Sequence, residues 1–248
     1  MAKPTDATPV VSDMDGSPVP PMNFITPDGF FALPLAGTSE ERAELAHAFV
    51  RELYSRGDET IWTPAAPYFE AIAEYLSDSG LAYSALGLFS TNDGGVVQCA
   101  FTVAAVQTDQ TDPEIAAQGI LATLSSDPLN DARWLDLPCG PAVSCVTLRE
   151  LSLNPAITAD GQPKKLLTGQ IEVYVPFPTG PYTAVFTLRT ASTEYWGEFC
   201  DGTVAILRTV SFPVPENNMG SSGQGDGRTE DDRNDAEDPQ NTNGRPCR

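Results

Sequence analysis

The sequence predicts an α+β domain with a mostly antiparallel sheet of six or seven strands and helices on both faces. Segments with strand and helix patterns follow one another in the order β-α-α-β-β-α-β-β-β-β-α between residues 24 and 212. Hairpins dominate this order, and only the strand pairs separated by helices can run parallel, since parallel strands need a long crossover. The strands on either side of residues 92–95 are apolar at most positions, which indicates a sheet covered on at least part of both faces.

Turn and capping residues mark the first strand and the first helix. The turn signal Pro-Asp-Gly at 27–29 precedes the apolar segment 30–35, which is predicted as a strand. Thr38 and Glu41 have the spacing of a capping box and open a helix that Gly57 ends. The buried face of this helix is predicted to carry Leu45, Phe49 and Leu53.

The second helix is predicted to take Thr63 as its N-cap and Pro64 as its first residue, and to end at Gly80. Trp62 would then precede the cap as a hydrophobic staple. The buried stripe of this helix is predicted to comprise Phe69, Ile72 and Leu76.

A hairpin and a third helix follow. Segments 81–90 and 96–107 are predicted as strands, joined by the turn Asn-Asp-Gly-Gly at 92–95. Asp112 and Pro113 open the next helix. Its apolar anchors are predicted to be Ile115, Ile120, Leu121 and Leu124.

Further strands and a last helix complete the domain. Residues 152–166 contain prolines and glycine and are predicted as a surface loop. Ser192 is expected to cap the last helix, which Pro213 limits. Apolar residues near helical period on that helix are Trp196, Cys200, Val204 and Leu207. The strands are predicted at 134–137, 142–151, 168–177 and 182–190.

The two ends of the chain are predicted to be disordered. Residues 1–23 form an arm whose prolines block regular structure, and residues 213–248 form an acidic tail with few apolar side chains. The chain carries 34 acidic and 14 basic residues, a formal net charge of −20, of which −14 lies on residues 24–212. This balance argues against nucleic acid and anionic lipid as partners, because both bind clustered Lys and Arg.

Neither membrane insertion nor an export signal is expected. No stretch of about 18 apolar residues occurs, and residues 1–21 lack the apolar run of a secretory signal. The five cysteines, an odd number, are expected to be free thiols of a cytoplasmic protein. The spacing of Cys139 and Cys145 does not fit a zinc site. Core positions are predicted for Cys99, Cys145 and Cys200.

No catalytic, cofactor-binding or metal-binding constellation stands out. The single histidine, His47, is predicted on the solvated face of the first helix, and no G-x-S-x-G motif is present. Acidic residues fall mostly at helix starts and in turns, where they cap helices and complement helix dipoles. The glycines at 94–95 join two strands, whereas a phosphate-binding loop leads into a helix, and segment 226–238 lacks the spacing of a calcium-binding loop. We therefore predict no catalytic residue, no cofactor and no metal, and we assign no binding residue.

Several segments resemble a known family. They are the opening segment ITPDGFFALPL at 25–35, the two strands at 170–188 and the helix end ILRTVSF at 206–212, together with 86–89 and 137–143. They look like uncharacterised domains of streptomycetes and related actinobacteria, and their layout resembles the PsbP-like superfamily. That superfamily includes photosystem II extrinsic subunits, Ran-binding import factors and mycobacterial LpqN-type lipoproteins. The resemblance implies an α-β-α sandwich that binds other proteins and is not usually an enzyme, and it transfers no functional residue.

The missing catalytic groups and the resemblance together predict a non-catalytic protein-interaction domain in the cytoplasm. Its partner would be another protein, in an adaptor, chaperone or immunity-type role. The alternative is a carrier of a small molecule or lipid, with a pocket between the sheet and the second helix near Tyr68, Tyr75 and Tyr83. A third alternative is an enzyme that works with carboxylates, serine or tyrosine and without histidine.

Overall fold

The computed structural model of the chain describes residues 19–35, 38–153 and 161–213. The predictions made for residues 1–18 and 214–248, among them the disordered ends, Cys247 and the acidic segment 226–238, lie outside the described residues. Residues 154–160, in the middle of the predicted loop, also lie outside them.

The helices and strands follow the predicted order. The helices are α1 (Ser39–Leu53), α2 (Glu59–Asp78), α3 (Pro113–Leu124) and α4 (Trp196–Leu207). The strands are β1 (Phe30–Ala32), β2 (Leu81–Ser90), β3 (Val96–Gln107), β4 (Asp131–Leu137), β5 (Gly140–Leu153), β6 (Lys164–Pro176) and β7 (Tyr182–Thr190). The capping box of Thr38 and Glu41 is present on α1, and the side chain of Asp112 caps α3 as predicted.

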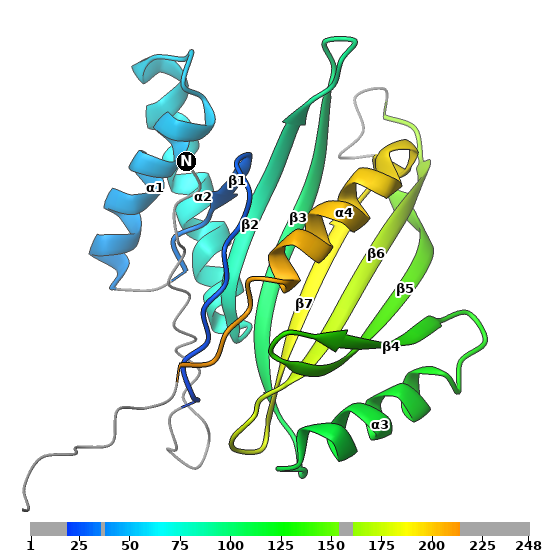
Figure 1. Cartoon of the computed structure of the whole chain (residues 1–248). Helices are drawn as coiled ribbons and strands as arrows, with labels where there is room; N and C mark the ends of the chain where they lie inside the picture. Colours follow the sequence, from blue (N-terminus) through cyan, green and yellow to red (C-terminus); the bar gives the residue numbers. More distant parts are fainter. Residues whose placement is uncertain (1–18, 36–37, 154–160, 214–248) are drawn as a thin grey trace, which may run out of the picture. The chain divides into compact units, whose positions relative to one another are not determined.

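The seven strands form one sheet in the order β1-β2-β3-β7-β6-β5-β4, and every neighbouring pair is antiparallel. The chain leaves β3 in the interior of the sheet, passes through α3 to the far edge at β4, and returns strand by strand until β7 pairs with β3 (Figure 1). Short turns join β2 to β3, β4 to β5 and β6 to β7, and helix α3 connects β3 to β4 at the far edge of the sheet. The predicted α+β class with an antiparallel sheet is confirmed, with seven strands.

One face of the sheet carries the main core, and α4 lies across it (Figure 1). Alternate side chains of β3 point to this face, and Phe101 and Val103 on β3 lie in register with Leu188 and Phe186 on β7. Burying a large apolar side chain of this kind contributes roughly 1.5–3 kcal/mol. The buried residues that α4 adds to the same cluster are Phe199, Ile206 and Leu207.

The segment that precedes β1 packs on the same face as α4. The ring of Phe24 meets Tyr83 and Phe186 edge-on, with ring centroids 5.1 and 5.6 Å apart. Val19 and Met22 are buried in the same cluster. The packed structure therefore includes residues 19–23, which the sequence analysis assigned to the arm, because apolar side chains among the prolines reach the core.

The opposite face carries the other three helices. Phe31 of β1 pairs with Leu86 of β2 and points to this face, where it joins the smaller core of α1 and α2 around Phe49 and Val50. Helix α3 packs on β4, β5 and β6, where Val143 and Cys145 are buried. Helices thus cover both faces of the sheet, as predicted.

Helix α2 starts earlier than predicted. Asp58 is its N-cap and accepts a hydrogen bond from the N–H of Thr60 at 3.0 Å, so Thr63 and Pro64 lie inside the helix. Trp62 therefore lies in the helix and does not precede its cap, so its prediction as a staple is wrong. The first turn of α2 is held by its Asp58 cap and by contacts with α1, where Trp62 donates to the carbonyl of Tyr54 and Glu59 pairs with Arg51, so the helix starts ahead of its internal prolines.

Other boundaries also differ. Ser192 makes no side-chain cap, and a 3-10 turn over Thr193–Tyr195 leads into α4. Strands β5 and β6 extend into the predicted loop, where Lys165 Nζ lies 2.6 Å from Glu150 Oε1 across the pair. Several residues predicted on buried faces are exposed, because a helix at the surface buries only part of its apolar arc. They are Leu45, Ile72, Ile115 and Val204.

We predict opposite effects for two glycine-to-alanine substitutions. A Cβ at Gly169 of β6 would lie 2.3 Å from Cζ3 of Trp196, whereas a Cβ at Gly119 of α3 would meet nothing within 4 Å. Gly169→Ala is expected to lower the free energy of unfolding by about 1–3 kcal/mol through overpacking. Gly119→Ala is expected to raise it by about 0.5–1 kcal/mol through helix propensity. Urea unfolding measures both, and equal shifts would contradict the packing of Trp196 on β6.

Candidate functional site

The structure places the reactive residues named from the sequence on separate parts of the described chain. His47 is exposed on α1, as predicted. Within the described residues, no group of three or more His, Cys, Asp or Glu side chains is placed to hold a metal ion. Of the helices that the structure describes, none has the length and apolar character needed to cross a membrane.

The four cysteines of the described chain are free thiols. Cys99 and Cys145 are buried as predicted, whereas Cys200 is only half-buried. Burial raises the pKa of Cys99 to about 12, and it also raises the pKa of Cys139, Cys145 and Cys200. Because the thiolate is the nucleophile, none of these four thiols is activated at neutral pH.

The three tyrosines of the predicted carrier pocket do not come together. Tyr83 is buried on the α4 side of the sheet, against Phe24 and Phe101. Tyr68 and Tyr75 lie on α2, which packs on the opposite side. The alternation of side chains along β2 explains the separation, since neighbouring positions on a strand point to opposite faces.

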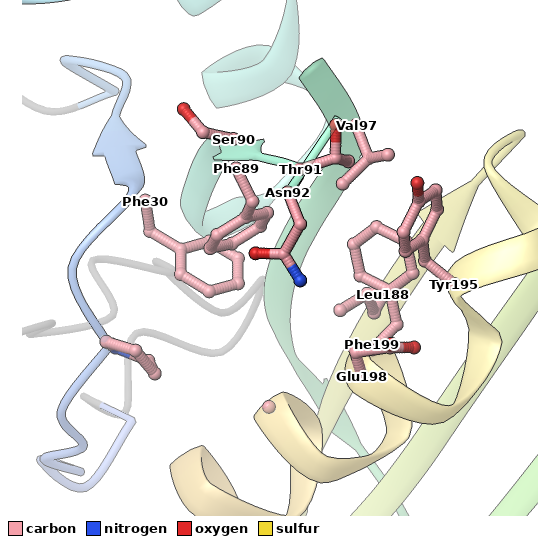
Figure 2. A pocket seen from close by; sticks show the side chains of 12 residues that line it. Phe30, Phe89, Ser90, Thr91, Asn92, Val97, Leu188, Tyr195, Glu198 and Phe199 are labelled. Atoms are coloured by element: carbon pink, nitrogen blue, oxygen red, sulfur yellow. The ribbon is translucent and has the colours of Figure 1, made fainter. Parts of the chain in front are cut away.

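A cavity of about 290 Å³ opens on the α4 side of the sheet (Figure 2). Phe89 of β2 is its central ring, with Phe30 of β1 at 5.3 Å and Phe199 of α4 at 6.2 Å between ring centroids. Val97 and Leu188 contribute aliphatic side chains from β3 and β7. Four strands and one helix therefore build an apolar chamber on a rigid sheet.

Polar groups occupy one part of the same cavity. The side chain of Asn92 projects between the Phe30–Phe89 pair and the rings of α4 and its preceding turn (Figure 2). Of the lining residues within the described part of the chain, Glu198 is the single charged one, and Tyr195 adds a phenol. Gly202 also lines the cavity, and a Cβ there would meet nothing within 4 Å. The arrangement of an apolar body with few polar groups is typical of small-molecule sites.

A second feature lies on the other side of the sheet, on α2. Ile61, Tyr68, Ile72 and Tyr75, named here the α2 stripe, are exposed although they are large and apolar. The side chains of Tyr68 and Tyr75 are the most exposed, at 74% and 71%. With 3.6 residues per turn, the four positions fall within roughly 60° of one another around the helix.

The α2 stripe points away from the helix that packs beside it. Phe69 meets Phe49 of α1 with ring centroids 4.9 Å apart, and Glu74 forms an ion pair with Arg42 of α1 at 3.6 Å. Both Phe69 and Glu74 lie on other arcs of α2 than the stripe. Neighbouring elements therefore do not account for the apolar character of the stripe.

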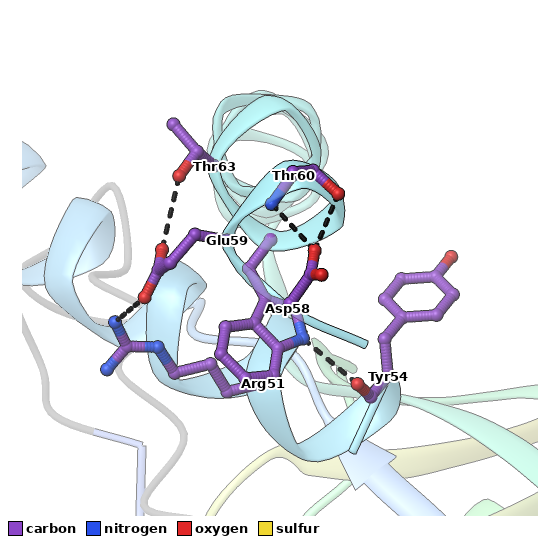
Figure 3. A network of polar contacts seen from close by, with 7 residues as sticks. Arg51, Tyr54, Asp58, Glu59, Thr60 and Thr63 are labelled. Carbon is purple, nitrogen blue, oxygen red and sulfur yellow. Dashed lines mark hydrogen bonds and ion pairs between the residues drawn. The ribbon is translucent and has the colours of Figure 1, made fainter. Parts of the chain in front are cut away.

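A polar clamp fixes α2 against the end of α1 (Figure 3). Arg51 of α1 pairs with Glu59 of α2 at 2.8 Å, and its guanidinium lies 5.5 Å from the ring centre of Trp62. The indole N–H of Trp62 donates to the carbonyl of Tyr54 at 2.9 Å. Hydrogen bonds from the side chain and then the backbone of Thr60 hold the pKa of Asp58 below its usual range, so the α2 cap stays ionised. The clamp presents the stripe on a fixed helix.

Sequence reasoning missed the α2 stripe although a signal was present. Ile61, Tyr68 and Tyr75 are spaced by seven residues, and Ala65 and Ile72 fall between them, which gives the 4-3-4-3 pattern of a coiled-coil seam. The shifted start of α2 hid this pattern, because Ile61 was placed before the helix. The cavity had no comparable signal, since its residues come from five separate elements.

Comparison with known proteins gives no match: no family model, no curated protein and no solved structure matches the chain. The PsbP-like resemblance therefore stays a prediction.

We expect the Asp58 cap to stabilise the first turn of α2, where Glu59 and Trp62 of the clamp lie. Asp58→Ala should lower the free energy of unfolding by about 1 kcal/mol, because it leaves helix N–H groups without their acceptor. Asp58→Asn keeps an acceptor and serves as the matched control. Urea unfolding compares the variants, and equal stability of Asp58→Ala and Asp58→Asn would contradict the capping role.

The burial of Cys99 predicts a pH dependence of stability. The thiol of an unfolded cysteine has a pKa of about 8.5, whereas folded Cys99 keeps its proton up to about pH 12. Between these values the unfolded state binds fewer protons, so the free energy of unfolding falls as pH rises, by at most about 1.4 kcal/mol per pH unit from this group. Urea unfolding between pH 8.5 and 10.5 should show a smaller slope for Cys99→Ala than for the parent. If the free energy of unfolding of Cys99→Ala and of the parent had the same slope against pH, burial would not raise the pKa of Cys99.

Proposed function

We propose that the chain is a protein-interaction domain that docks an amphipathic, positively charged helix of another protein on the α2 stripe. The carrying observation is the exposure of two tyrosines and two isoleucines in one line, on the opposite side of α2 from its buried residues Ala66 and Ala73. Exposed apolar groups gathered in this way mark interaction surfaces. Tyrosine is also enriched among the residues that contribute most to binding.

The spacing of the α2 stripe supports a helical partner. Side chains at 4-3-4-3 spacing lie along one seam of a helix and interlock with a second helix that has the same repeat. The α2 stripe runs from Ile61 to Tyr75 within helix α2, which at 1.5 Å per residue is about 21 Å of seam. Each covered tyrosine would bury on the order of 150–250 Å².

The charge of the helical hairpin supports a basic partner. Residues 39–78 carry nine carboxylates and three arginines, and Arg42 and Arg51 are paired with Glu74 and Glu59. The field around the α2 stripe is therefore negative, which favours Lys and Arg beside the apolar seam of the partner. A second copy of this chain would bring two negative hairpins together, so we take the occupant to be a different protein.

The wider proposal follows from these features and from the PsbP-like resemblance. The domain acts in the cytoplasm as an adaptor, chaperone or immunity-type partner, without chemistry of its own. The raised pKa values of the thiols and the exposed position of His47 are consistent with this role.

The proposal predicts binding of a model helix. The probe is a synthetic 18-residue peptide with leucine at the seam positions and lysine elsewhere. The parent chain is expected to bind it, and the double variant Tyr68→Ala, Tyr75→Ala to bind it at least roughly tenfold more weakly. Isothermal titration calorimetry measures both. Because both tyrosines are exposed, circular dichroism should show the variant folded as the parent is.

Two controls separate the stripe from general electrostatic attraction. Leu129→Ala removes an exposed apolar side chain outside α2 and should leave peptide binding unchanged, and a peptide with glutamate in place of lysine should not bind. Equal affinity of the parent and the double variant would refute docking on the α2 stripe. A concentration-dependent dimer in sedimentation, lost in the double variant, would show instead that the stripe binds a second copy.

A further inference from the structure

We infer that the cavity beside α4 binds a small apolar amine, with its ring or branched body in the chamber and its ammonium group at Glu198. This site is on the opposite face of the sheet from the α2 stripe and is independent of the proposed docking function. Its lining residues come from β1, β2, β3, β7, α4 and the adjoining turns.

The size of the cavity fits a ligand of one ring with a short side chain. An engineered protein cavity of about 150 Å³ binds benzene, and this cavity measures about 290 Å³. Phe30, Phe89 and Phe199 are arranged edge-to-face around it, so both ring faces and ring edges are available to an apolar or aromatic body. A long acyl chain would exceed this volume.

The charge of the residues that line the cavity favours a positively charged ligand. Among the described residues that line the cavity, Glu198 is the single charged one, and none of them is a lysine or arginine. A ligand carboxylate or phosphate would therefore meet a carboxylate and find no basic side chain, which is unfavourable. A cation gains from Glu198 and also from the aromatic faces, which attract positive charge. Asn92 adds an amide oxygen that accepts a hydrogen bond from an ammonium group.

Gly202 keeps the chamber open. It lines the cavity from α4, and a Cβ added there meets nothing within 4 Å. A larger side chain at this position would project into free space, and leucine is a better helix former than glycine. Gly202→Leu is therefore expected to place a side chain at the cavity, with no conflict at its Cβ. Gly197, on the same helix and outside the cavity lining, offers the matched control.

The test uses the full chain and three soluble probes of similar size: 2-phenylethylamine, 2-phenylethanol and 3-phenylpropanoate. The amine is expected to bind with a dissociation constant of about 0.1–1 mM, in line with the affinity that a ligand of this size reaches. The alcohol should bind roughly three- to tenfold more weakly, because it lacks the charge, and the acid should bind least. Two-dimensional NMR titration of the parent and the variants measures all three.

Four variants test whether the probes bind in this cavity and whether the ammonium group pairs with Glu198. Glu198→Gln should remove the preference for the amine over the alcohol, whereas Glu194→Gln, which changes a neighbouring carboxylate outside the lining, should keep it. Gly202→Leu should abolish binding of both, and Gly197→Leu should retain it. Equal affinity of the parent for the amine and the alcohol would overturn the inference, as would unchanged amine binding in Gly202→Leu or no binding up to 10 mM.

Discussion

The pairing of β3 with β7 is the constraint on which the rest of the structure depends. It runs in register from Cys99 opposite Thr190 to Gln107 opposite Tyr182, and the hydroxyl of Thr190 donates to the carbonyl of Gln98 at 2.6 Å. These strands are distant in the sequence, so the pairing closes a long loop at an entropic cost. Burial of Phe101 and Leu188, which lie opposite each other on one face, offsets that cost.

This register also determines on which face of the sheet the cavity lies. Because side chains alternate along a strand, a shift of one residue would exchange the two faces of β3 and β7. In the observed register Val97 and Leu188 face the cavity under α4. The same register leaves the polar and small side chains of β3 and β7, such as Gln98, Ala100 and Arg189, on the side that carries α1, α2 and α3. The cavity is therefore a product of long-range pairing.

The α2 stripe has a different physical origin. It depends on the local geometry of one helix, on its cap at Asp58 and on the clamp between Arg51, Glu59 and Trp62. Helix α2 packs near the edge of the sheet that β1 and β2 form, so only part of its surface meets other elements. Since the stripe and the cavity lie on opposite faces, occupation of one does not sterically block the other. The two proposed sites are therefore compatible with each other.

Much of the fold was predictable because its signals are local. The hairpin turn at Asn92–Gly95, the capping box of Thr38 and the Asp112 cap act within a few residues, and the alternation of apolar residues showed the strands. The start of α2 was not predictable in this way. Two competing caps, Asp58 and Thr63, were both plausible from the sequence, and contacts with α1 favour the first.

The sequence by itself determined the class of the fold, the order of its elements and the net negative charge of the chain. The tertiary structure decided where the residues of the candidate binding sites lie. Tyr68, Tyr75 and Tyr83 share a sequence neighbourhood, yet strand alternation and helix packing place Tyr83 in the core and leave the other two exposed. Phe30, Phe89 and Phe199 are distant in the sequence and meet around one cavity. The physical reason is that a local pattern fixes the direction of a side chain relative to its own element, whereas a site is set by the register and packing that bring several elements together.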